Sequence, residues 1–143
     1  MYSKVIMQRF QQASNFGIIR NSQATGQSEN LAGNIVKIYL DVEDGVVYKA
    51  KFKALGGVEL IALCDILCDK IEHKKIEDLM TFTVFDLNDK SYMLKDESLL
   101  SLVVDALQDA LEDYHKKQEK IRFQLEEFAR FAEMAKQANK ETK

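Results

Sequence analysis

Alternating apolar and polar residues mark the stretch between Ala32 and Gly57. Alternation with a period of two predicts half-buried strands, and two such runs flank a turn signal. We predict an antiparallel hairpin with the three-residue loop Glu43-Asp44-Gly45, because glycine can supply the positive φ that this loop needs while the apolar residues stay on one face. That face comprises Val36, Ile38, Leu40, Val42, Tyr48, Ala50 and Phe52.

The register of this hairpin follows from the loop. With three loop residues Leu40 pairs with Tyr48, and Lys49, Lys51 and Lys53 point to the solvated face. The segment before the hairpin, residues 13–34, is polar and predicts a long loop, with a short strand over 17–20 added to the hairpin edge.

Helical spacing of apolar residues dominates the rest of the chain. The predicted helices cover residues 2–12, 58–72 and 96–139, and short helical turns are expected between 75 and 95. Together the elements predict an α+β fold, in which helices pack on one face of a small antiparallel sheet of two or three strands.

The last predicted helix carries an apolar seam with alternating steps of four and three residues. Its members are Leu100, Val104, Leu107, Leu111, Tyr114, Gln118, Ile121, Leu125, Phe128, Ala132 and Ala135, of which only Gln118 is polar. At about 1.5 Å per residue the helix is roughly 63 Å long, whereas a globule of this chain length is roughly 37 Å across. The helix therefore either breaks near 115–117 and folds back, or projects.

A projecting helix would leave part of its apolar seam in water unless a partner covers it. We predict a homo-oligomer whose seam contains Tyr114, Ile121, Leu125 and Phe128. We also predict one domain over 1–114, followed by a helical extension over 115–143 that is continuous with the last domain helix.

Composition narrows the class of protein. The 143 residues carry a net charge of −3, and the excess of acidic residues lies in 1–114 whereas 115–143 is basic. This balance gives no support for a nucleic-acid partner. We find no apolar run of membrane-spanning length and no signal peptide, and we predict a cytoplasmic protein with reduced thiols and no membrane partner.

Three stretches of the chain resemble the N-terminal domain of the IscU and NifU family, the scaffolds of iron–sulfur cluster assembly. The opening YSKVIMQRFQQASNFG resembles the family's first signature and matches it at Tyr2, Val5, Ile6, Met7, Asn15 and Gly17. AGNIVKIYL resembles the Cys-Gly-Asp block with the strand that follows, and FKALGGVELIA resembles the Phe-Lys-x-x-Gly-Cys-x-x-x-Ile-Ala block. The resemblance runs from Tyr2 to about Tyr114 and implies the scaffold fold.

The resemblance also implies a 2Fe–2S cluster or zinc, held by three cysteines with the help of an aspartate or histidine. The family's ligand positions fall here on Ala32, Asn34, Gly57, Ser98 and Leu99. None of these side chains is a thiolate, the soft anionic donor that such iron sites require. We therefore predict that no cofactor is held. The family's chaperone-docking sequence Leu-Pro-Pro-Val-Lys is missing too, and NDKSYMLK stands in its place.

Other groups offer only weak candidates for a metal site. Cys64 and Cys68 lie four residues apart and could bind one metal with His73 or Asp69. Because both cysteines lie within the apolar stripe of their helix, we interpret them as core residues. No nucleophile has an adjacent base and no glycine-rich phosphate loop is present, so we predict no enzymatic activity.

We predict a degenerate, scaffold-like protein that acts by protein–protein contact, as a regulator or adaptor in iron–sulfur assembly. The resemblance implies docking on a cysteine desulfurase through the N-terminal helix and the edge of the cluster site; another assembly protein is also possible as partner. Two alternatives stay open. One is a working scaffold with substitute ligands, and the other is a small-molecule-binding or structural oligomer that uses a less polar concavity between Ala32, Gly57 and Leu99.

Overall fold

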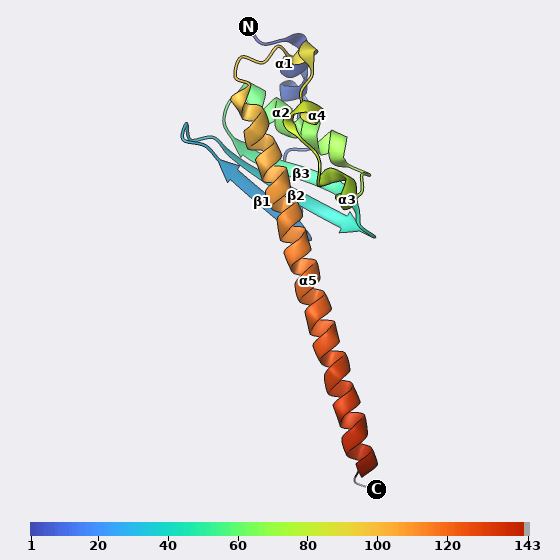
Figure 1. Ribbon diagram of the computed structural model, residues 1–143. Helices are drawn as coiled ribbons and strands as arrows, with labels where there is room; N and C mark the ends of the chain where they lie inside the picture. The colour runs from blue at the N-terminus through green and yellow to red at the C-terminus, as the bar shows by residue number, and fades with distance from the viewer. Residues whose placement is uncertain (142–143) are drawn as a thin grey trace.

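The structure is a computed structural model that describes residues 1–141 (Figure 1). Its elements are α1 (Lys4–Gln11), β1 (Ala24–Glu29), β2 (Ile35–Glu43), β3 (Val46–Leu55), α2 (Val58–Ile71), α3 (Ile76–Leu79), α4 (Val84–Leu87), the 3-10 turn η1 (Lys90–Tyr92) and α5 (Ser98–Glu141). Residues 142 and 143 of the predicted extension lie outside the described residues.

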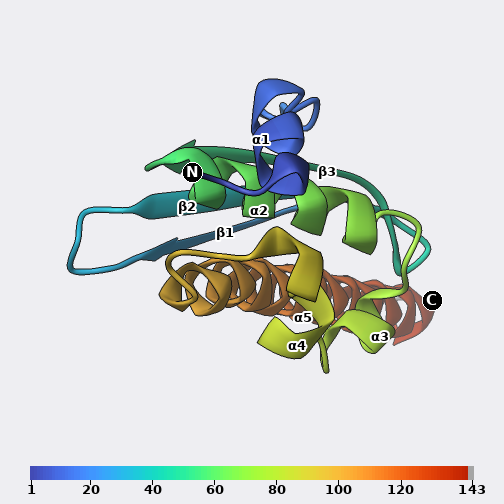
Figure 2. The same cartoon turned by 90° about the horizontal axis from the view of Figure 1, so that it is seen from above.

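The three strands form one antiparallel sheet in the order β1-β2-β3. α5 packs on β1 and β2, α2 packs on β3 and against α5, and α1 crosses α2 (Figure 2). The buried side chains between the sheet and the helices form a single hydrophobic core. β2 contributes every second side chain to this core, because successive residues of a strand point to opposite faces of the sheet. The predicted α+β class is confirmed.

The turn of the β2–β3 hairpin is shorter than predicted. Glu43 pairs with Val46, so the loop is the two-residue Asp44-Gly45 and not Glu43-Asp44-Gly45. Both loop residues have positive φ, 53° and 73°, as a type I′ turn requires. The backbone twist of such a turn matches the right-handed twist of the flanking strands.

A bulge in β3 keeps the apolar residues on one face in spite of the shorter turn. The register shifts between Asp41 and Val42, and Tyr48 is the extra residue. Tyr48 is therefore exposed, whereas it was predicted to be buried, and Leu40 pairs with Ala50 instead of with Tyr48. The predicted register is therefore wrong along the hairpin, and Ile38 pairs with Phe52. The predicted faces hold beyond the bulge: Val36, Ile38, Leu40, Ala50 and Phe52 are buried, and Lys49, Lys51 and Lys53 lie on the solvated face.

β1 was not predicted, because its sequence ATGQSE is almost entirely polar. It pairs along its whole length with β2, whereas the predicted strand over 17–20 is absent. α5 supplies the packing that the sequence of β1 lacks. A Cβ placed on Gly26 would lie 2.2 Å from both the Ala106 carbonyl oxygen and the Ala110 nitrogen, so only glycine allows helix and strand to approach this closely.

α5 also covers the outer edge of β1. The Thr25 N–H donates to the Asp113 carboxylate at 2.9 Å, and the Gln27 N–H donates to the Asp109 carboxylate at 2.8 Å. Edge strands present backbone donors that need partners, and here a helix provides them. Burial alone would raise the pKa of Asp113, but the Thr25 N–H and the Lys117 ammonium outweigh it and hold that pKa below its ordinary value.

The outer edge of β3 is covered as well. Phe52 exchanges backbone hydrogen bonds with Asn15 and Gly17, the Ala50 N–H donates to Glu72, and Val47 exchanges backbone hydrogen bonds with His73 and Lys74. At this edge Phe16, which directly precedes the predicted strand over 17–20, forms a single bridge with Phe52.

We expect Asp113→Ala to lower the free energy of unfolding by about 1 kcal/mol at pH 7, since the Thr25 N–H loses its acceptor. The pKa of Asp113 is lowered in the folded state, so its contribution is complete above the unfolded value and is lost as the pH falls through the folded value. The difference between native and variant chains should thus shrink below about pH 4. Urea unfolding across pH measures it. Asp105→Ala, an exposed carboxylate on the same helix, is the control and should change little.

α5 is one unbroken helix that projects from the body (Figure 1). Its seam residues Leu100 to Leu111 are buried in the core, and Tyr114 is partly buried. From 115 to 140 every side chain is exposed apart from the partly buried Ala132. Of the two alternatives, projection is the one observed. No helix among residues 1–141 has the length and apolar character that a membrane span needs.

Candidate functional site

The five positions at which the resemblance places the family's ligands lie at one end of the body. Ala32 and Asn34 are in the β1–β2 connection, and Gly57 joins β3 to α2. Ile35 pairs with Leu55, which places these two connections at the same end of the sheet. Ser98 and Leu99 open α5, and its first turns lie beside the end of β1, where the Ser28 hydroxyl donates to the Leu102 carbonyl at 2.5 Å.

Glu59 holds two of these segments together. It lies in the first turn of α2 and is 5% exposed. Its carboxylate accepts from the Lys95 N–H at 2.8 Å and from the Asp96 N–H at 3.1 Å. The approach to α5 is therefore fixed against the start of α2. The position of the Ser98 backbone is fixed in turn, since its N–H donates to the Asp96 carboxylate at 3.1 Å.

The side chains at this end do not fit an iron–sulfur cluster or a zinc ion. Ala32, Gly57 and Leu99 have no donor atom, and Leu99 is only 7% exposed. Ser98 and Asn34 offer neutral oxygen and nitrogen atoms, and the Ser98 hydroxyl already donates to Asp96. Soft thiolates are what such iron and zinc sites use. Within residues 1–141, no three or more His, Cys, Asp or Glu side chains are grouped so that they could bind a metal.

Cys64 and Cys68 are both completely buried in the core on α2. Burial raises the pKa of each thiol, and the Asp65 carboxylate adds to the effect on Cys64. Neutral, inaccessible thiols are poor metal ligands. Asp69, one of the predicted co-ligands, is instead engaged with Arg9. The placement favours core packing for both cysteines.

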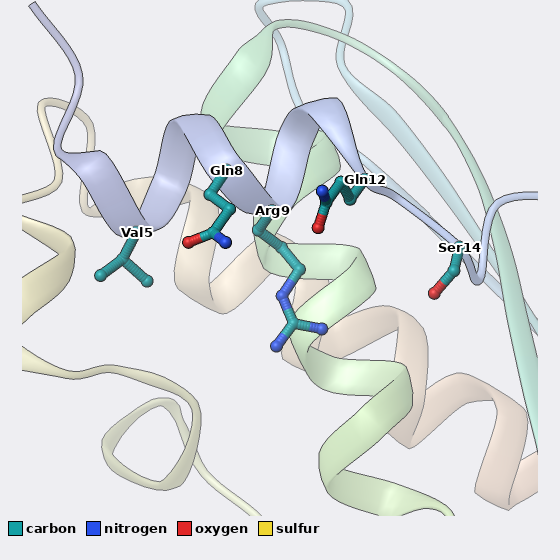
Figure 3. A pocket seen from close by; sticks show the side chains of 5 residues that line it. All are labelled: Val5, Gln8, Arg9, Gln12 and Ser14. Atoms are coloured by element: carbon teal, nitrogen blue, oxygen red, sulfur yellow. The ribbon is translucent and has the colours of Figure 1, made fainter.

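A second surface lies on α1, where a pocket of about 360 Å³ is lined by Val5, Gln8, Arg9, Gln12 and Ser14 (Figure 3). Val5, Gln8 and Arg9 of α1 and the C-cap residue Gln12 are spaced three or four apart and so share one face of the helix. Figure 3 shows Arg9 reaching from this face toward α2. The surface is polar apart from Val5, which is 40% exposed.

Asp65 on α2 holds this α1 surface in place. Its carboxylate is fully buried, pairs with Arg9 at 3.0 Å and accepts from the Asn15 N–H at 2.9 Å. Arg9 also pairs with Asp69, and the two carboxylates raise the pKa of Arg9 although burial opposes this. A buried charge is tolerated only when it is paired and hydrogen-bonded, so the network anchors α1 on α2.

Sequence reasoning missed both Glu59 and Asp65. The available signal was an acidic residue among the apolar positions of a helix, which indicates a buried charge with a specific partner. That signal does not identify the partner, because Arg9 and the Lys95 N–H lie far away along the chain.

Comparisons with known proteins agree on one family. The family model described as "NifU-like N terminal domain" matches residues 1–121. The "Iron-sulfur cluster assembly scaffold protein IscU 1" of Archaeoglobus fulgidus is 28% identical over 124 residues, which cover 85% of this chain and 81% of that protein. The scaffold protein IscU of Aquifex aeolicus is 23% identical over 125 residues, 84% of this chain and 80% of that protein.

Solved structures show the same fold. A NifU-like N-terminal protein from Brucella abortus superposes with a TM-score of 0.67 at 16% identity, over 80% of this chain and 94% of that chain. A putative scaffold protein for the SUF system from Fervidobacterium islandicum superposes with a TM-score of 0.60 at 21% identity, over 77% and 96%.

Proposed function

Because this chain belongs to the NifU-like N-terminal family of iron–sulfur cluster assembly scaffolds, we propose that it has kept the scaffold's body and lost its cluster. The observation that carries the proposal is the set of side chains at the five ligand positions, of which three have no donor atom. The connections that carry these positions are still fixed, as the buried Glu59 carboxylate illustrates. The protein would then act by contact, as a regulator or adaptor, with no catalytic role.

The α1 surface is the part best suited to such contact. Scaffolds of the family are expected to dock on a cysteine desulfurase through the N-terminal helix. Here Tyr2, just before that helix, and Val5, Ile6 and Met7 within it match the family signature. Arg9, Asp65 and Asn15 lock its position, so the surface is preorganised and loses little entropy on binding. A chain that docks without holding a cluster would compete with working scaffolds.

Titration of the native chain against the cysteine desulfurase of the same organism tests this proposal. We expect binding at micromolar concentrations or below, and we expect a cluster-holding scaffold to displace the chain. The absence of binding at high micromolar concentrations would contradict the proposal. Stoichiometric iron or zinc in the purified native chain would instead support the alternative of a scaffold with substitute ligands.

We expect Val5→Glu to weaken desulfurase binding at least about tenfold, because a carboxylate placed in the contact must be desolvated without a partner. Isothermal titration measures the change. Gln11→Glu is the matched control: it adds the same charge to an exposed position of α1 outside the pocket and should leave affinity nearly unchanged. An equal effect of both substitutions would mean that net charge, and not this surface, controls binding.

The projecting part of α5 is the second proposed contact surface. Its exposed apolar residues include the predicted oligomer seam, Ile121, Leu125 and Phe128. We propose that this seam joins copies of the chain, so that the body and the projecting helix have separate tasks.

A further inference from the structure

The projecting helix, residues 115–140, carries more exposed apolar surface than a solvated helix needs. Ile121, Leu125 and Phe128 are 48%, 64% and 72% exposed and lie on the line that continues the buried seam of the body. Intrahelical ion pairs such as Arg122–Glu126 at 4.0 Å stabilise a helix by only a few tenths of a kcal/mol each. A stripe of large apolar side chains on such a helix indicates that another helix covers it.

The spacing of the seam defines a heptad register. Tyr114, Ile121, Phe128 and Ala135 occupy the d positions, and Gln118, Leu125 and Ala132 occupy the a positions. Residues at a and d form the interface of a two-stranded coiled coil. The sizes are unequal along the helix, because the large residues come first and the alanines follow.

We infer that two copies of this chain pair through these helices in an antiparallel coiled coil centred between residues 126 and 127. In this register Leu125 faces the partner's Phe128, and Ile121 faces the partner's Ala132. Gln118 faces the partner's Ala135. Every large side chain near the ends of the interface therefore meets a small one, which is how facing layers reach an even packing density.

The parallel arrangement fits less well. It would place Phe128 against the partner's Phe128 and Ala132 against the partner's Ala132, which gives one crowded layer next to one with a gap. It would also bring Lys117 beside the partner's Arg122 on both sides of the interface, and like charges at these flanking positions disfavour pairing. In the antiparallel register Arg122 faces the partner's Ala129 instead. Size and charge thus favour the same orientation.

The inference rests on the proposed role of the projecting helix as a contact surface, and it does not depend on which protein binds α1. The pairing would hold the two bodies at opposite ends, separated by about 25 residues of helix, or roughly 38 Å. Phe123 and Met134, which are also exposed, lie outside the interface and provide controls.

Mass in solution, measured by sedimentation on the full chain without any partner, tests the pairing. We expect the native chain to have twice its 16.4 kDa mass and Phe128→Glu to raise the dissociation constant of the dimer about 100-fold or more, since a carboxylate would be buried in each half of the interface. Phe123→Glu makes the same change outside the interface and should stay dimeric. A native chain that is monomeric at high micromolar concentrations overturns the inference, as does dissociation by Phe123→Glu alone.

Cysteine cross-linking tests the orientation. The double variant Gln118→Cys with Ala135→Cys should form covalent dimers on mild oxidation, and each single variant should not, because residue 118 of one chain lies roughly 26 Å along the axis from residue 118 of the other. Covalent dimers of Gln118→Cys alone would establish the parallel arrangement and overturn the inference. Desulfurase binding separates the two proposals. If the native chain is monomeric and still binds the desulfurase, only the pairing is wrong; if the native chain is dimeric and does not bind it, only the proposed docking is wrong.

Discussion

A variant that combines Ala32→Cys, Asn34→Asp, Gly57→Cys and Leu99→Cys is expected to acquire a 2Fe–2S cluster on anaerobic reconstitution, whereas the native chain is not. The three thiolates would supply the soft donors that the family uses and that compensate the charge of the irons. The positions already lie at one end of the body, and a Cβ on Gly57 would meet no atom within 4 Å. Visible charge-transfer absorption and the iron content per chain measure the gain.

The matched control for this variant carries serine in place of the three new cysteines. Serine has the size of cysteine but no thiolate, so it reproduces any structural effect without the ligands. Iron uptake by the serine chain or by the native chain would contradict the proposed loss of the cluster, and would point to Cys64 and Cys68 as substitute ligands. A quadruple variant that folds and still binds no iron would mean that more than the ligands has been lost.

Replacing Gly26 with valine is expected to lower the free energy of unfolding by about 3 kcal/mol or more, the upper range for overpacking in a core. A Cβ there would lie 2.2 Å from two backbone atoms of α5, and the backbone of a buried helix cannot move aside as a flexible side chain could. Displacement of α5 would also remove Asp113 and Asp109 from the edge of β1. Denaturant unfolding followed by circular dichroism measures the loss.

Gly57→Ala is the control for this effect. Gly57 precedes the first turn of α2 with φ −87°, and it has no neighbour within 4 Å of an added Cβ. We expect a cost below about 1 kcal/mol, the ordinary difference between glycine and alanine before a helix. Equal losses in Gly26→Val and Gly57→Ala would show that the close approach of α5 to β1 contributes little to stability.

An element can be predicted from the sequence when its own apolar residues repeat with the period of a strand or a helix. β2 alternates cleanly, and α2 and α5 repeat at helical spacing, so each was predicted near its observed bounds. β1 has no such period, because Gly26 and the polar residues around it depend on Ala106, Ala110 and the carboxylates of α5. Residues 24–29 alone do not predict these contacts, because the α5 residues that make them follow some 80 residues later in the chain.

The length of the hairpin turn was predicted wrongly for a different reason. The alternation of apolar and polar residues favours the three-residue loop, because that loop keeps Tyr48 on the apolar face. A bulge solves the same problem by turning Tyr48 outward, and the alternation of residue types does not reveal it. At the candidate site, the five positions of the family's ligands follow from the resemblance. The roles of Glu59 and Asp65 cannot be predicted in this way, because they depend on how α2 packs against other parts of the chain.

The covered edges of the sheet limit how this protein can recognise others. β-augmentation, in which a partner's extended peptide joins a sheet as one more strand, needs a free row of backbone donors and acceptors. Here Asp109 and Asp113 engage the donors of β1, and the backbone around Asn15 and His73 engages those of β3. At these positions the sheet has no free donor for an added strand, so a partner that binds there must contact side chains.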